Sequence, residues 1–102
     1  MKKFYYYANC KGDLILLKKG YKFTDKNGNE YGASYNDGIW DITELKTGVL
    51  VSLASQPVKK KELIQSYIDS KADTVTKLLS QDSYIKLIEK FSELIADYER
   101  KL

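Results

Sequence analysis

The hydrophobic pattern of this chain changes its period at Pro57, which is its only proline. Before Pro57, short segments alternate apolar and polar residues and are separated by turn residues, which is the pattern of β-strands. After Pro57, apolar residues recur three and four positions apart, as they do along the buried face of an α-helix. The sequence therefore predicts an α+β fold, in which a curled antiparallel β-sheet of about five or six short strands is followed by two C-terminal α-helices that pack on it.

The length and composition predict a single domain. A chain of 102 residues can bury one modest core and is too short for two. Its content of 43% hydrophobic and 30% charged residues is typical of a globular protein and not of a disordered chain. We expect residues 1–102 to fold as one unit, with a β-rich half at 1–54, a helical half at 55–102, and a switch between layers at 55–57.

Turn sequences divide the β-rich half into six predicted strands. These strands are expected at residues 3–8, 14–17, 21–24, 30–35, 39–43 and 49–54. Gly20 is expected to separate the second strand from the third, and residues 27–28 (NG) to form a hairpin turn before the fourth. The second strand is apolar on both faces, so we expect it in the centre of the sheet. In the first strand, alternation places Tyr6 on the opposite face from Tyr5 and Tyr7.

Two helices are predicted after Pro57, because proline suits the first turn of a helix. The buried stripe of the first helix is expected at Leu63, Ile64, Tyr67, Ile68, Ala72, Val75, Leu78 and Leu79. This helix either breaks near Ser70 or runs to Ser80. In the second helix, apolar residues follow a heptad spacing at Tyr84, Ile88, Phe91, Ile95, Tyr98 and Leu102. The heptad stripe predicts either packing on the sheet or a homodimer through Tyr84, Ile88, Phe91, Ile95 and Tyr98.

The residue inventory argues against an enzyme. The chain contains no histidine and one cysteine, Cys10, so neither a Ser-His-Asp nor a Cys-His site can form, and thiolates cannot hold a metal. The sequence has no glycine-rich phosphate loop. Residues 25–30 (DKNGNE) are too short for a calcium-binding loop and lack its final glutamate, which favours a plain hairpin turn. We therefore expect a non-enzymatic protein with no cofactor and no metal site.

The sequence also predicts a cytoplasmic protein. One cysteine cannot form an intramolecular disulfide, and the N-terminal segment lacks the basic start, apolar run and cleavage site of a signal peptide. The longest purely apolar runs are four or five residues long, whereas a helix needs about 20 apolar residues to cross a bilayer. We expect no contact with a membrane.

Aromatic and basic residues supply the candidate partner-binding positions. Nine tyrosines and one tryptophan are more than a small core can hide, and tyrosine is favoured at interfaces. Tyr5 and Tyr7 are the first candidates. Lys59, Lys60 and Lys61 fall in the expected first turn of a helix, where the helix dipole disfavours cations. Such a violation of a local rule predicts a site for an acidic partner.

A second set of candidates predicts contact with nucleic acid. Residues 19–23 (KGYKF) partly match the RNP1 pattern of RNA-binding sheets, in which aromatic rings stack on bases. Tyr21 is the expected stacking ring. Lys22, which stands where the pattern has a small residue, is the expected phosphate contact. The net charge of +3 is low for a nucleic-acid binder, so a single-stranded nucleic-acid-binding β-domain is the alternative function at this point.

Three segments carry a resemblance to known proteins. Residues 38–44 (GIWDITE), 47–49 (TGV) and the lysine-rich stretch 59–62 follow a strand-turn-strand-helix pattern similar to that of small accessory proteins from phages and mobile elements of low-GC bacteria, anti-CRISPR proteins among them. The Lys-, Asn-, Ile- and Tyr-rich composition is similar too. The resemblance assigns a role to no individual residue.

What the resemblance implies is a protein-binding inhibitor that blocks a host defence or nucleic-acid-handling complex in the bacterial cytoplasm. Its partner would be a host protein or a ribonucleoprotein complex, and direct contact with nucleic acid is compatible with that partner. A structural, self-assembling protein that dimerises through its last helix is the third function that the sequence leaves open.

Overall fold

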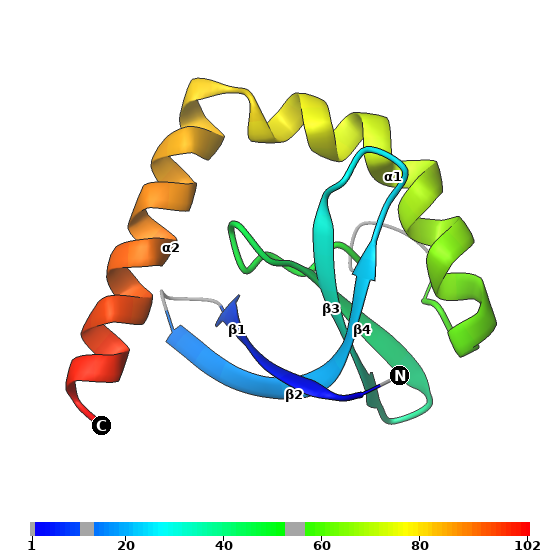
Figure 1. Ribbon diagram of the computed structural model, residues 1–102, viewed down its shortest axis with the longest axis horizontal. Helices are drawn as coiled ribbons and strands as arrows, with labels where there is room; N and C mark the ends of the chain where they lie inside the picture. The colour runs from blue at the N-terminus through cyan, green and yellow to red at the C-terminus, as the bar shows by residue number, and fades with distance from the viewer. Residues whose placement is uncertain (1, 11–13, 53–56) are drawn as a thin grey trace.

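The computed structural model describes residues 2–10, 14–52 and 57–102. Within these residues the chain forms one four-stranded antiparallel sheet in the order β1-β2-β3-β4, followed by helices that arch around it (Figure 1). The elements are β1 (Phe4–Cys10), β2 (Leu14–Thr24), β3 (Glu30–Asn36), β4 (Ile39–Glu44), the 3-10 turn η2 (Lys61–Leu63), α1 (Ile64–Leu79) and α2 (Asp82–Arg100). The predicted α+β class is confirmed, with fewer described strands than expected.

β2 is one continuous strand, so the predicted break at Gly20 is wrong. Gly20 pairs with Phe4 of β1, and the next residue, Tyr21, pairs with Ala33 of β3. The strand therefore passes from one partner to the other at the glycine. A Cβ atom at Gly20 would lie 2.1 Å from the carbonyl oxygen of Ala33. Glycine is required here because the backbones of β2 and β3 approach closely at this position, and not because the chain turns.

The sixth predicted strand, at residues 49–54, does not form in its described part. Leu50 makes an isolated bridge with Thr43, and the Val51 N–H donates to the Ile42 carbonyl at 2.8 Å. These two contacts attach the segment to β4 without continuing the ladder. The predicted turn residues 11–13 and the layer switch at 55–56 lie outside the described residues, as do residues 53–54.

The helical half begins later than predicted. Residues 57–60 are extended, and Val58 forms a bridge with Trp40, whose N–H donates to the Val58 carbonyl at 2.7 Å. Val58 is buried by this contact, so Pro57 precedes an extended segment instead of starting a helix. α1 then runs without a break through Ser70, whose hydroxyl donates to the Tyr67 carbonyl one turn earlier.

The main core lies between α1 and one face of the sheet. The buried residues of α1 are Ile64, Ile68, Ala72 and Val75, which confirms the inner part of the predicted stripe. Across from them, the register pairs Ala33 with Ile42 and so places their side chains on one face of β3 and β4. Burial of each of these aliphatic side chains contributes about 1.5–3 kcal/mol to the stability of the fold.

A second, smaller contact attaches β1 and α2 to the rest of the molecule. The Tyr6 ring is buried against Gly32, and a Cβ atom added at Gly32 would lie 2.6 Å from that ring. The preceding residue, Tyr5, is exposed. The alternation predicted for the first strand is therefore confirmed. In α2, Phe91 is buried against Gly48. Phe91 and Tyr98 of the heptad stripe thus contact the β half of their own chain.

Candidate functional site

One face of the sheet gathers aromatic rings and lysines beside the part that α1 covers. In the β1–β2 ladder Tyr5 lies opposite Lys19, and Tyr21 follows two residues further along the same face of β2. In the β3–β4 ladder Tyr35 lies opposite Trp40. We name as the basic-aromatic face the residues Lys3, Tyr5, Lys19, Tyr21, Tyr35, Trp40 and Lys61.

Three lysines of this face contact its rings. The Lys61 ammonium lies 3.9 Å from the centre of the Tyr21 ring, and the Lys3 ammonium lies 5.7 Å from the same ring. The Lys19 ammonium lies 5.3 Å from the centre of the Tyr5 ring. These are cation-π distances, and such contacts hold the ammonium groups in place without neutralising their charge.

The same three lysines carry uncompensated charge. Among the described residues, Lys3, Lys19 and Lys61 form no ion pair with a carboxylate. Lys18 and Lys22, by contrast, pair with Asp41 at 3.6 Å and with Glu30 at 2.6 Å. Unneutralised cations on one small surface attract an anion more strongly than paired ones do.

The rings form a platform with a buried support. Trp40 is 9% exposed and contacts both Tyr21 and Tyr35, with ring centres 6.2 and 5.4 Å apart. Tyr5 and Tyr35 are 64% and 61% exposed, so both rings are available to a partner. A pocket of about 200 Å³ opens here, lined by Lys3, Lys19, Gly20, Tyr21, Ala33, Ser34, Tyr35 and Trp40. The described residues of this lining include cations and aromatic rings and no carboxylate.

Three of the residues predicted for partner binding join this face: Tyr5, Tyr21 and Lys61. Lys59 and Lys60 are exposed in the extended segment that leads from the Val58 bridge to η2. Only Lys61 belongs to a helical turn, so the three lysines do not form the first turn of an α-helix as predicted. The argument that the helix dipole disfavours all three of them is therefore wrong.

Two predicted residues are separated from the basic-aromatic face. Lys22 alternates with Tyr21 along β2, so it projects from the opposite face and pairs there with Glu30. Tyr7 is half-buried and its ring lies 5.7 Å from that of Tyr98 on α2. Both side chains are engaged within the chain itself.

Residues outside the predicted set complete the face. Lys19 shares a face with Tyr21, and strand alternation alone could have identified it. Tyr35 and Trp40 flank the turn at residues 36–39, so hairpin register could have paired them. The proximity of Lys3 and Lys61 had no sequence signal, because it depends on how the curled sheet and the segment before α1 meet.

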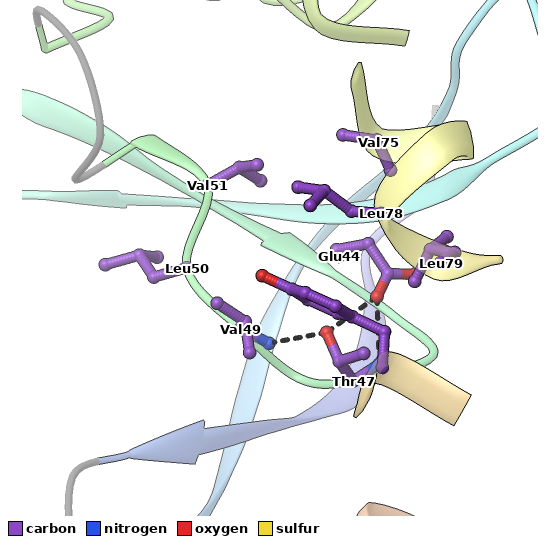
Figure 2. Close-up of a pocket in the computed structure, with 9 residues that line it drawn as sticks. Glu44, Thr47, Val49, Leu50, Val51, Val75, Leu78 and Leu79 are labelled. Atoms are coloured by element: carbon purple, nitrogen blue, oxygen red, sulfur yellow. Dashed lines mark hydrogen bonds between the residues drawn. The ribbon is translucent and has the colours of Figure 1, made fainter. Parts of the chain in front are cut away.

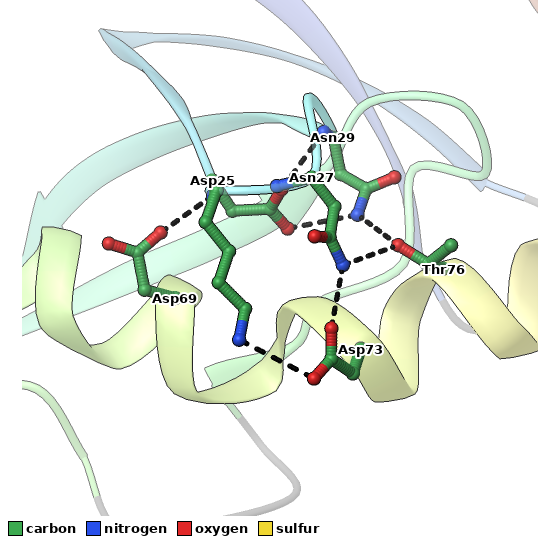
Figure 3. Close-up of polar contacts among 7 residues, drawn as sticks. Asp25, Asn27, Asn29, Asp69, Asp73 and Thr76 are labelled. Carbon is green, nitrogen blue, oxygen red and sulfur yellow. Dashed lines mark hydrogen bonds and ion pairs between the residues drawn. The ribbon is translucent and has the colours of Figure 1, made fainter.

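A separate polar cluster docks the β2–β3 loop on α1 (Figure 3). The backbone N–H groups of Asn27 and Asn29 donate to Asp25 Oδ1 at 2.9 and 3.0 Å, and the Tyr31 hydroxyl donates to Asp25 Oδ2 at 2.7 Å. Burial raises the pKa of Asp25, but the hydrogen bonds outweigh it and leave the pKa below its usual value. The Asn27 amide then donates to Asp73 of α1 at 2.9 Å.

This loop cluster is structural. The Asp25 oxygens accept hydrogen bonds from the loop itself, as expected of the plain hairpin turn predicted at residues 25–30. Among the described residues, no group of three or more His, Cys, Asp or Glu side chains is placed to hold a metal ion.

An apolar pocket of about 170 Å³ lies between the C-terminal part of α1, the start of α2 and the segment that follows β4 (Figure 2). Its lining is Glu44, Thr47, Val49, Leu50, Val51, Val75, Leu78, Leu79 and Tyr84. The Glu44 carboxylate accepts the Lys46 and Thr47 N–H groups at 2.7 and 2.9 Å and the Thr47 hydroxyl at 2.7 Å. The turn itself satisfies this buried acid, so the pocket offers mainly aliphatic surface.

The fold and the face define a small α+β protein with a meander sheet, a helical C-terminal half and a basic-aromatic surface. Comparisons of the chain with protein-family models, with curated proteins and with solved structures gave no match. In the described parts of the chain, no helix is both long and apolar enough to cross a membrane.

Proposed function

We propose that this protein is a non-enzymatic binding module that inhibits a host complex, and that the basic-aromatic face is the surface that meets the partner. One observation carries the proposal. Three ammonium groups that form no ion pair with a described residue, those of Lys3, Lys19 and Lys61, are grouped with the exposed rings of Tyr5 and Tyr35. Like charges held this close repel one another, and an anionic partner relieves that repulsion.

The kinds of side chain on the face suit binding. Exposed tyrosines offer a rigid contact area and a hydroxyl group that can form hydrogen bonds. The buried Trp40 packs against the Tyr35 ring and so holds it in position. Lysine is depleted at the centre of ordinary protein interfaces, so three unpaired lysines favour a strongly anionic partner. A nucleic-acid-handling complex of the host is such a partner, because nucleic acid carries a charge on every phosphate.

The chemistry of the face supports binding instead of catalysis. Its described lining contains no carboxylate, thiol or imidazole, which are the side chains that most often act as acids, bases or nucleophiles. The sequence resemblance to small phage and mobile-element proteins supports a stoichiometric inhibitor within this class. We propose a host protein or ribonucleoprotein complex in the bacterial cytoplasm as its target.

Affinity purification of the tagged protein from a low-GC bacterium tests the proposal. The wild-type chain should recover one defined host complex, identified by mass spectrometry. The double variant Lys19→Glu with Lys61→Glu should lose that complex.

The matched control is Lys46→Glu with Lys86→Glu, which makes the same change in net charge at exposed positions after β4 and on α2. The control should keep the complex. Equal recovery by the face variant and the control would show that this face is not the binding surface, and recovery of no defined complex by the wild type would contradict the proposed function.

A further inference from the structure

We infer that the basic-aromatic face binds single-stranded nucleic acid, with bases stacked on Tyr5 and Tyr35 and phosphates beside Lys3, Lys19 and Lys61. This inference rests on the proposed function, because it names the ligand of the same face.

The exposed rings supply the first half of the argument. Tyr5 comes from β1 and Tyr35 from the end of β3, and each exposes more than three fifths of its surface. Every base has a π-face, so an exposed ring can take any base, and each stacked base changes affinity by about 5- to 100-fold. Trp40 contributes by packing against Tyr35, which reduces the ordering that binding requires.

The lysines supply the second half. The ammonium groups of Lys3 and Lys61 both lie over the Tyr21 ring, and Lys19 borders the same pocket. Lys59 and Lys60, which precede Lys61 in an extended segment, are exposed and add two positive charges next to it. A flexible phosphate backbone can follow such a track while its bases turn toward the rings.

The exposed rings also distinguish a single-stranded nucleic acid from two other anionic ligands, a duplex and an acidic peptide. In a duplex the bases stack on one another and present no face to a side chain, so ring stacking needs unpaired bases. An acidic peptide would pair with the lysines but would leave Tyr5 and Tyr35 without stacking partners. The combination of rings and cations therefore favours a single strand over both.

The pocket is poorly equipped to read base edges. Ser34 is the one uncharged hydroxyl of its lining apart from the tyrosines, and its oxygen already bonds to Tyr6 and donates to the Lys19 carbonyl. Among the described residues, no Asn, Gln, Asp or Glu side chain lines the pocket to form the paired hydrogen bonds that identify a base. Binding should therefore tolerate sequence and respond mainly to strandedness.

The test is fluorescence anisotropy with the purified full chain and a labelled oligothymidylate of about 15 nucleotides, a length that spans one small binding domain. A duplex of the same length is the comparison. The single strand should bind more tightly than the duplex. Between about 50 and 200 mM salt, the logarithm of affinity should fall with a slope of about −2 against the logarithm of salt, because three phosphate contacts each contribute about −0.7.

The variants separate stacking from charge. Tyr5→Ala and Tyr35→Ala should each weaken binding by about 5- to 100-fold, whereas Tyr5→Phe and Tyr35→Phe keep a ring and should bind nearly as wild type. Lys22→Gln, on the opposite face, should also bind as wild type. Because both tyrosines are largely exposed, all these variants should fold, and a melting curve for each checks that they do.

The outcomes distinguish this inference from the proposed function. Absence of oligonucleotide binding, together with a host complex that still depends on Lys19 and Lys61, would overturn the inference and leave the proposed function standing with an acidic protein surface as ligand. Oligonucleotide binding that is indifferent to the tyrosines, or equally tight for the duplex, would also overturn it. Ring-dependent binding of the single strand would support it.

Discussion

Asp25 illustrates what a single residue contributes to this fold. Its carboxylate accepts hydrogen bonds from the Asn27 and Asn29 backbone N–H groups and from the Tyr31 hydroxyl. One buried acid therefore fixes the conformation of the loop and connects the loop to the core residue Tyr31. The sequence predicted the turn, because Asn-Gly pairs favour hairpins. It could not predict that the loop would dock on Asp73 and Thr76 of α1, since that contact joins residues more than forty positions apart.

Asp25→Asn should therefore lower the free energy of unfolding by about 2–4 kcal/mol at neutral pH, because an amide cannot accept all the bonds that the carboxylate accepts. The pKa of Asp25 is lower in the folded chain than its value of about 4 in the unfolded chain. This contribution is thus complete above about pH 4 and is lost as the pH falls through the lower folded-state pKa.

Urea unfolding at a series of pH values measures this effect. The difference between wild type and Asp25→Asn should shrink as the solution is acidified. Asp37→Asn is the control, because Asp37 is exposed, has a φ of 53° that asparagine tolerates, and should change stability little. If the difference in the free energy of unfolding between wild type and Asp25→Asn stays constant down to pH 2, ionisation of Asp25 does not stabilise the fold.

At the scale of elements, the sequence predicted the type of each segment better than its limits. The period of two before Pro57 and the period of three to four after it correctly separated strands from helices. Gly20 was misinterpreted because a glycine demanded by a close backbone approach resembles one demanded by a turn. Pro57 was misinterpreted because the burial of Val58 against Trp40 holds the next residues extended, and only the tertiary contact reveals it.

α2 depends on a narrow contact, and Phe91 is its anchor. Tyr84, Ile88, Ile95 and Tyr98 of its stripe are only half-buried, and Leu102 is exposed. Phe91, by contrast, is 3% exposed and packs where Gly48 leaves room for its ring. Phe91→Ala should cost about 3–5 kcal/mol and should loosen α2 before the sheet. In hydrogen-exchange measurements, the backbone amides of α2 should exchange faster in Phe91→Ala than in the wild type, and the amides of β3 should be affected less.

Ile85→Ala is the control for Phe91→Ala, because Ile85 lies on the same helix and is 43% exposed. Uniform loss of protection in all elements after Phe91→Ala would mean that α2 unfolds only together with the sheet. A wild-type mass that rises with concentration would instead favour the predicted homodimer through the α2 stripe.

At the scale of the whole molecule, the candidate site is a product of topology. β1 with the residue before it, β2, the β3–β4 hairpin and the segment before α1 each supply one or two side chains to the basic-aromatic face. Composition predicted that some of the nine tyrosines would be exposed, and Tyr5 and Tyr35 are among those that are. It could not predict which lysines would lack a carboxylate partner, because ion pairing depends on the curl of the sheet and the docking of α1.

The same topology predicts that the β half and the helical half unfold together. Trp40, the only tryptophan, contacts the sheet, the Val58 segment and the core beneath α1, so its fluorescence reports on their junction. Far-ultraviolet circular dichroism reports chiefly on the helices. In urea, the two signals should change at the same midpoint and with the same slope, as in a two-state transition. Thr76→Ala removes the one acceptor on α1 that the side-chain amides of Asn27 and Asn29 share, and it should lower both midpoints equally. Loss of the helical signal before the Trp40 signal would show two independent units.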